Sequence, residues 1–113
     1  MSEAFKDERT LQHNPIPERL NKARKKLGVS QKQLGIRIGM DESSASGRMN
    51  HYEKGRHVPD IDTLRKLAIE LSVPLNYFFC EDDLSAELAC LVSNLDEAMK
   101  KKLIGMIKDS EEK

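Results

Sequence analysis

Residues 30–55, SQKQLGIRIGMDESSASGRMNHYEKG, contain the signals of two short helices separated by a tight turn. Ser30 and Gln33 have the S-x-x-Q spacing of a capping box, in which each side chain can bond the backbone N–H of the other residue. The box predicts a helix over about 31–38, which Gly39 ends. The residues expected on its inner face are Leu34, Gly35 and Ile38.

A second helix is predicted over about 42–53, with Asp41 as its N-cap candidate. Its inner stripe has i, i+4, i+7 spacing and consists of Ala45, Met49 and Tyr52. The outward side is unusual, because a glycine in a helix interior costs roughly 1 kcal/mol relative to alanine. That side comprises Ser43, Ser46, Gly47, Asn50 and Lys54, flanked by Ser44, Arg48 and His51. Two short helices joined by a glycine-containing turn form a helix-turn-helix motif.

Helical spacing of apolar residues continues on both sides of this motif. Upstream, a helix is predicted over about 17–27, with Pro17 at its first position. Downstream, helices are predicted over about 61–72, capped by Asp60, and over about 74–79. The residues of these three helices expected to face the core are Leu20, Ala23, Arg24, Leu27, Ile61, Leu64, Leu67, Ala68, Leu71, Leu75, Phe78 and Phe79.

A stripe of leucine and methionine residues follows the acidic turn 81–83. It predicts two helices rather than one long rod, since Asn94 and Glu97 have capping-box spacing. The stripe either covers the core of its own chain or forms a dimer seam. Because residues 84–107 exceed what a five-helix unit needs, a dimer seam is favoured. Its members are Leu84, Leu88, Leu91, Leu95, Met99, Leu103 and Met106.

No segment has the periodicity of a strand, so an all-α fold is predicted, with five helices and one or two more at the C-terminus. The expected organisation is a flexible arm over 1–14, a helix-turn-helix domain over 15–80 and a helical extension over 81–113. No apolar run reaches the ~18 residues of a membrane span, and the N-terminus lacks the apolar stretch of a signal peptide. A cytoplasmic location is therefore expected.

Charge is distributed unevenly, although the net charge of the 113 residues is zero. Residues 1–59 carry 12 Lys and Arg against 7 Asp and Glu, whereas residues 60–113 carry 7 against 12. This asymmetry suggests that the first half binds a polyanion. A charged, solvated surface would give the same pattern.

Catalysis, metal binding and cofactor binding are not predicted, because none of their common motifs is present. The adjacent residues His51, Tyr52 and Glu53 do not converge on one substrate atom, since successive residues of a helix point about 100° apart. Cys80 and Cys90 lack the C-x-x-C spacing of a zinc or redox site. They are interpreted as reduced thiols.

DNA binding would explain the small polar face of the 42–53 helix. The major groove of DNA admits an α-helix, and small side chains allow the helix backbone to approach the bases. Serine and asparagine can donate and accept hydrogen bonds at base edges, and arginine can pair with guanine. The alternative is that these residues only solvate a surface helix.

Three segments, with Gly39 between the first two, resemble the Xre/Cro-type helix-turn-helix family of bacterial and phage repressors. They are RKKLGVSQKQLG (24–35), YEKGRHVP (52–59) and LRKLAIELSVP (64–74). The patterns R-x-x-L-G-x-S-Q, E-x-G-x-x-x-P and L-x-K-L-A-x-x-L-x-V-P are specific when they occur together in this order. The resemblance covers residues 17 to about 80 and implies a five-helix DNA-binding domain that usually acts as a dimer on palindromic operators.

The resemblance also implies roles for individual residues. Gln31 matches the residue that contacts backbone phosphate and braces the recognition helix, and Glu53 matches an acid that pairs with Arg24. The residues that match the family's phosphate-gripping positions are Lys54, Gly55 and Arg56. The residues predicted to contact DNA are Gln31, Lys32, Ser43, Ser44, Ser46, Arg48, Asn50, His51, Lys54 and Arg56.

One departure from the family pattern lies between Gly39 and Gly55, where this chain is longer by about one helical turn. Either the recognition helix is extended at its N-terminus or the turn is longer, and which of Ser43 and Ser44 reaches the groove stays open. Arg48 has an alternative role too, since it could pair with an acid of the protein itself.

The predicted function is sequence-specific binding of double-stranded DNA by a transcriptional regulator, a repressor acting as a homodimer on a palindromic operator. Within that class the chain would be a phage repressor or an antitoxin whose C-terminal helices bind a toxin. The alternative is a protein-interaction module that keeps the fold without binding DNA. The acidic pair Asp41-Glu42 favours this alternative, whereas the basic loop 54–57 opposes it.

Overall fold

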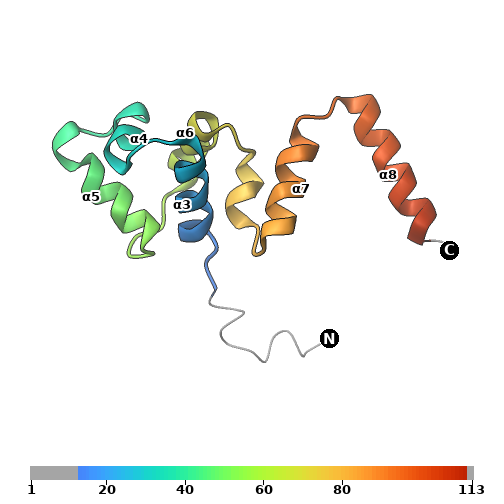
Figure 1. Ribbon diagram of the computed structural model, residues 1–113, viewed down its shortest axis with the longest axis horizontal. Helices are drawn as coiled ribbons and strands as arrows, with labels where there is room; N and C mark the ends of the chain where they lie inside the picture. The colour runs from blue at the N-terminus through green and yellow to red at the C-terminus, as the bar shows by residue number, and fades with distance from the viewer. Residues whose placement is uncertain (1–12, 112–113) are drawn as a thin grey trace.

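The computed structural model describes residues 13–111, and every regular element in that range is helical. In chain order these are α3 (Ile16–Leu27), α4 (Gln31–Arg37), α5 (Glu42–Glu53), α6 (Ile61–Leu71), the 3₁₀ helix η1 (Leu75–Phe79), α7 (Asp83–Ser93) and α8 (Glu97–Glu111) (Figure 1). The prediction of an all-α fold, with five helices followed by two C-terminal ones, is confirmed. Nearly all of the predicted arm over 1–14 lies outside the described residues.

Side-chain caps fix the starts of several helices. At α4 the capping box is complete: Ser30 Oγ accepts from the Gln33 N–H at 3.0 Å, and Gln33 Oε1 accepts from the Ser30 N–H at 2.8 Å. At α6, Asp60 Oδ1 accepts from the Thr63 N–H at 2.8 Å. Helix α3 begins one residue earlier than predicted, so Pro17 is its second residue. Turn chemistry read from the sequence therefore placed these boundaries to within a residue.

The start of α8 differs from the prediction. Asp96, not Asn94, accepts a hydrogen bond from the first turn, through the Met99 N–H at 2.8 Å. Asn94 is the C-cap of α7, where its own N–H donates to the Leu91 carbonyl at 3.2 Å. The predicted capping box with Glu97 was wrong because a carboxylate stands closer to the helix and takes the N-cap role.

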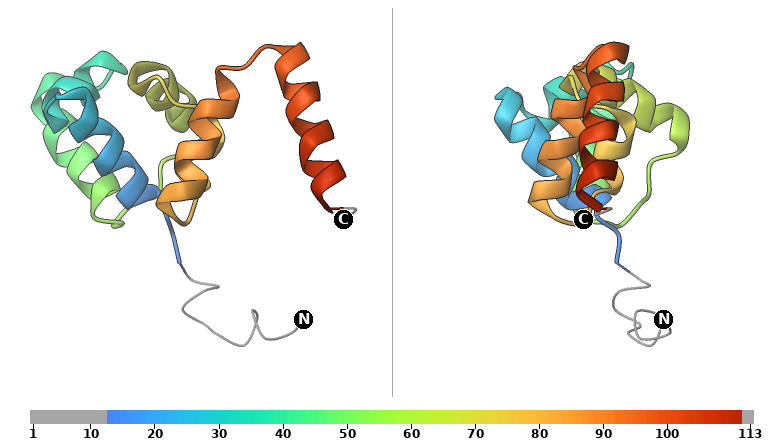
Figure 2. Two further views of the ribbon diagram at one scale, coloured as in Figure 1. Left: turned by 45° about the vertical axis from the view of Figure 1, so that its right-hand side comes forward. Right: turned by 90° about the vertical axis from the view of Figure 1, so that its right-hand side faces the viewer.

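The core lies among α3, α4, α5, α6 and η1 and includes Ala86 of α7. In the left view of Figure 2, helices α3 to α6 cluster at one end of the molecule. The largest fully buried side chains of the core are Leu20, Leu34, Met49, Leu67 and Phe78. Helices α4 and α5 approach each other closely where Gly35 faces Ala45. A Cβ added at Gly35 would lie 2.8 Å from the Ala45 Cβ and 3.0 Å from the Met40 Sδ.

Gly35→Ala is therefore expected to lower the free energy of unfolding by about 1–2 kcal/mol, because the added methyl group overpacks the contact between α4 and α5. Gly47→Ala is the matched control, since a Cβ at Gly47 meets nothing within 4 Å. The control should raise stability by about 0.5–1 kcal/mol through helix propensity alone. Urea unfolding of both variants checks the prediction, and a stabilised Gly35→Ala protein would contradict it.

Three residues predicted to face the core are exposed instead. Leu27, Ile61 and Phe79 are 41%, 50% and 50% exposed. Leu27 and Ile61 are terminal residues of their helices, beyond the cover of neighbouring elements. Phe79 points outward because a 3₁₀ helix has three residues per turn, which aligns it with the exposed Asn76. Tyr77 is buried in its place.

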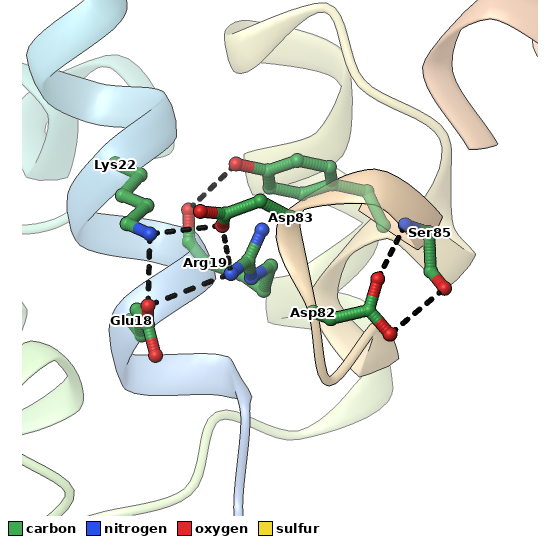
Figure 3. A network of polar contacts seen from close by, with 7 residues as sticks. Glu18, Arg19, Lys22, Asp82, Asp83 and Ser85 are labelled. Atoms are coloured by element: carbon green, nitrogen blue, oxygen red, sulfur yellow. Dashed lines mark hydrogen bonds and ion pairs between the residues drawn. The ribbon is translucent and has the colours of Figure 1, made fainter. Parts of the chain in front are cut away.

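A buried arginine joins α3 to the start of α7 (Figure 3). The Nη2 atom of Arg19 donates to Asp83 Oδ1 at 2.6 Å, and Lys22 Nζ donates to the same oxygen at 2.8 Å. The Tyr77 hydroxyl donates to the Arg19 carbonyl at 3.2 Å, and the tyrosine ring lies 5.8 Å from the guanidinium carbon. Hydrogen bonds from Lys22 and Arg19 hold the pKa of Asp83 below its usual value, so the charged carboxylate fixes α7 against α3.

Candidate nucleic-acid interface

Helix α5 has one buried side and one open side. The inner stripe of Ala45, Met49 and Tyr52 is buried, as predicted. The exposed residues of the open side are Ser43, Ser46, Gly47 and Arg48, with Ser44, Asn50 and His51 half-buried beside them. This face is nearly flat except for one long cation, so its backbone is able to approach another surface closely.

The additional residues between Gly39 and Gly55 lie in the helix rather than in the turn. Helix α5 begins at Glu42, one residue after Asp41, and continues without interruption to Glu53. The open alternative is thereby resolved in favour of a helix extended at its N-terminus. Ser43, in the added turn, is exposed.

The N-terminal end of α5 is acidic and internally bonded. The Asp41 carbonyl accepts from the Ala45 N–H at 2.9 Å, but the Asp41 carboxylate accepts from the Ser43 hydroxyl and not from a helix N–H. Asp41 thus occupies the N-cap position without the predicted side-chain cap. Lys32 Nζ lies 3.5 Å from Glu42 Oε1, which links α4 to α5 at this end.

A buried carboxylate anchors the other end of α5. The Glu53 side chain is 2% exposed and accepts from Arg24 Nε at 2.5 Å and from Arg24 Nη2 at 3.0 Å. It also accepts from Asn21 Nδ2 at 2.8 Å and from Gln31 Nε2 at 3.1 Å. The pairing of Arg24 with Glu53 that the family resemblance implied is present. The contact from Asn21 had no sequence signal, because a single asparagine on a helix surface is uninformative.

Gln31 orients a residue of the open face. Its Nε2 donates to Asn50 Oδ1 at 3.2 Å as well as to Glu53. Because the Asn50 carbonyl oxygen accepts this bond, its amide N–H groups are left to donate outward. An amide held in this way is suited to acceptors such as the N7 and O6 atoms at purine edges.

A basic loop continues from the C-terminal end of α5. Lys54, Gly55, Arg56 and His57 are all exposed. The Arg56 N–H donates to the His51 carbonyl at 2.9 Å, and the His51 and His57 rings meet edge to face with centroids 5.0 Å apart. Gly55 has a φ of +75°, a conformation that side chains disfavour, so it allows the chain to turn there.

Arg48 extends from the middle of the exposed face. Within residues 13–111 it forms no ion pair, and neither do Lys54 and Arg56. The intramolecular pairing considered for Arg48 is therefore absent from this part of the chain. Three cations face solvent along and beyond α5, which is the arrangement that a phosphate backbone and base edges require.

Other kinds of site find no support in the described part of the chain. Residues 13–111 contain no group of three or more His, Cys, Asp or Glu side chains able to hold a metal ion. Cys80 and Cys90 are free thiols and pack half-buried against the core. None of the helices between these limits is long and apolar enough to cross a membrane.

Two known proteins are similar to this chain. The HTH-type transcriptional regulator ImmR of Bacillus subtilis (strain 168) is 30% identical over 87 residues, which are 75% of this chain and 65% of ImmR. The chain thus spans about two thirds of the length of that relative. The crystal structure of the transcriptional regulator BswR superposes with a TM-score of 0.74 at 48% identity, covering 83% of this chain and 93% of BswR.

The family model of a helix-turn-helix domain matches residues 18–82, more than half of the chain. That stretch begins two residues into α3 and ends just before α7, so it contains nearly all of the five-helix unit. Together with the likeness to ImmR and BswR, this match identifies the family. The chain belongs to the Xre-type helix-turn-helix family.

Proposed function

We propose that this protein is a DNA-binding transcriptional regulator that inserts α5 into the major groove. The observation that carries the proposal is the open face of α5, which is small and polar and leads into a basic loop. At its centre lies Arg48, which forms no ion pair within residues 13–111. ImmR and BswR, both named as transcriptional regulators, add support. Ser46, Arg48 and Asn50 are assigned to base edges, with Ser43, Ser44 and His51 at the margins.

Phosphate contacts would hold the protein in register on the duplex. Lys32 of α4 lies beside Glu42, the first residue of α5, whereas Gln31, which bonds Asn50 and Glu53, lies with Lys54 and Arg56 at the other end of the reading helix. Contacts of this kind position a helix without reading sequence. The base contacts between them would then supply specificity.

The proposed regulator acts as a homodimer that represses by occupying a palindromic operator. In this arrangement residues 15–80 bind one half-site each, and residues 81–113 join the two copies. A dimer of such domains reads half-sites about one helical turn of DNA apart. A cytoplasmic location fits this role.

A second candidate is an interaction module or antitoxin-type protein that uses its C-terminal helices to bind a protein partner. The exposed leucines of α7 and the two acids at the start of α5 favour it. Under this reading DNA binding would be weak and insensitive to sequence. Binding assays with competitor DNA separate the two candidates.

Salt dependence tests the phosphate contacts. Three cations per copy, Lys32, Lys54 and Arg56, would neutralise about six phosphates in a dimer, so log affinity should fall against log salt with a slope of roughly −5. Fluorescence anisotropy with a labelled operator between about 50 and 200 mM salt measures this slope. Lys54→Ala should make the slope shallower by about 2, one per copy. A slope near zero would contradict the proposal.

A further inference from the structure

Helix α7 is apolar on two opposite sides. Its inner side places the buried Ala86 and the half-buried Cys90 against η1 and α3. Its outer side carries Leu84, Leu88 and Leu91 at i, i+4, i+7 spacing, and these are 74%, 60% and 57% exposed. A helix that is apolar on both sides normally lies between two layers of protein. The outer stripe of α7 therefore lacks a covering layer among residues 13–111.

Helix α8 packs on no other helix of residues 13–111 over more than a few residues. None of its 15 residues is buried. Its large apolar side chains are Met99, Leu103, Ile104, Met106 and Ile107; Leu103 is half-buried and the other four are 46–60% exposed. An isolated helix of about 15 residues is only marginally stable in water. The stripe Met99, Leu103, Met106 repeats the spacing of the α7 stripe and needs a surface to pack on.

The chain does not bring the two stripes together itself. Only residues 94–96 connect α7 to α8, and α8 stands apart from α7 in Figure 1 and in the left view of Figure 2. Helix α8 makes no extensive contact with any other described helix. Leu95, within the connection, is half-buried.

The charges beside the two stripes are opposite. Residues 81–93 contain four acids and no Lys or Arg, whereas α8 contains three consecutive lysines, Lys100 to Lys102. Glu87 lies three residues after Leu84, the first residue of the α7 stripe. Lys102 likewise lies three residues after Met99, the first residue of the α8 stripe. Stacking α7 on a second α7 would therefore place Glu87 near another Glu87. Stacking α7 on α8 pairs Glu87 with Lys102 instead, which favours that combination.

We propose that two copies of this chain exchange their C-terminal helices, so that α8 of each copy lies on the outer stripe of α7 in the other. This exchange specifies how the two copies of the proposed homodimer would associate, and it rests on that proposal. The arrangement is two-fold symmetric and closed, since each copy offers both surfaces once. It covers both exposed stripes with one contact. Because Arg19 and Lys22 hold the first turn of α7, the exchanged helices would also fix the distance between the two α5 helices.

Cysteine cross-linking tests the exchange in the full chain. Leu88→Cys and Leu103→Cys, each at the middle of its stripe, are made separately in a Cys80→Ser/Cys90→Ala background and coexpressed with tags of different size. Mild oxidation should join the two different chains at least about tenfold faster than either variant joins to itself, since a disulfide requires Cα atoms about 4.4–6.8 Å apart. Equally fast self-linking of Leu88→Cys would overturn the exchange, because it places α7 against α7. A double variant that closes within one chain would overturn it too.

Charge reversal provides a second, non-covalent measurement. Glu87→Lys and Lys102→Glu should each raise the dimer dissociation constant roughly fivefold, because two exposed pairs per dimer turn repulsive. The double variant should return to within about twofold of wild type, since the pairs are re-formed. Sedimentation measures these constants, and an unchanged Glu87→Lys dimer would refute the pairing. Operator binding of the wild-type chain is measured in parallel. If the chain binds its operator but Leu88→Cys and Leu103→Cys do not cross-link, the helix exchange alone is refuted. If the wild-type chain shows no specific binding, the proposed function is refuted.

Discussion

Glu53→Ala should lower the free energy of unfolding by about 3 kcal/mol, because it removes the buried carboxylate that Arg24, Asn21 and Gln31 share. The side chain of Arg24 is only 13% exposed, and its guanidinium would keep its charge with the Val29 carbonyl but no carboxylate to bond. Glu42→Ala is the matched control, since it removes an exposed glutamate from the other end of the same helix. The control should change stability by less than about 0.5 kcal/mol.

The pH dependence of unfolding distinguishes this cause from simple loss of packing. Burial acts to raise the pKa of Glu53, but hydrogen bonds from Arg24, Asn21 and Gln31 outweigh it and leave the pKa below the ordinary value of 4.5. The folded state thus holds the proton less tightly than the unfolded state does. The stabilisation from Glu53 is full above the unfolded pKa and disappears as the pH falls through the lower, folded pKa.

Urea unfolding of wild type and Glu53→Ala between neutral and acid pH measures the effect. The difference between the two proteins should be largest near pH 7 and should shrink below the unfolded pKa of 4.5. A constant difference at all pH values would mean that the carboxylate charge does not carry the stabilisation. A difference below about 1 kcal/mol at pH 7 would refute the buried-pair account itself.

Gly47→Leu is expected to abolish specific DNA binding while leaving the fold intact. Gly47 lies on the open face of α5, where a Cβ would meet nothing within 4 Å, so the isolated protein accommodates a side chain. In the proposed complex the same side chain would stand between the helix backbone and the bases. Specific sites are usually bound at least about 1,000-fold more tightly than nonspecific DNA. The Gly47→Leu variant should lose most of this difference in affinity.

Gly105→Leu is the control for this substitution. Gly105 is also a helical glycine with nothing within 4 Å of an added Cβ, but it lies in α8, away from α5. Operator affinity of this control should match wild type, and both variants should unfold at or above the wild-type temperature. Unimpaired operator binding by Gly47→Leu would show that the small residues of α5 serve another purpose.

Much of the fold could be predicted because its boundaries depend on local chemistry. The capping box at Ser30 and Gln33 and the cap at Asp60 act within four residues, so sequence spacing is sufficient to find them. The error at Phe79 had a different origin: a 3₁₀ helix and an α-helix place the same residue on different faces, and the choice between them depends on packing.

The contacts that the sequence did not predict join residues that are far apart in the chain. Arg19 lies at a core position of α3, yet its partner Asp83 is 64 residues away and could not be found by periodicity. Its neighbours Ile16, Leu20 and Ala23 form an apolar stripe that includes position 19, which was the available signal. The contact between Gln31 and Asn50 joins residues 19 positions apart on different helices, and only the family resemblance suggested that Gln31 supports α5.

The central claim, that α5 reads DNA sequence, is tested most directly by binding to the intergenic DNA upstream of the protein's own gene in the presence of excess nonspecific DNA. Wild type, Arg48→Ala and Arg65→Ala are compared, the last removing an exposed arginine from α6. The account predicts specific retention by wild type and Arg65→Ala, and a loss of roughly 10–100-fold in Arg48→Ala at unchanged thermal stability. Absence of binding to this DNA and to a random operator library at low salt would contradict it.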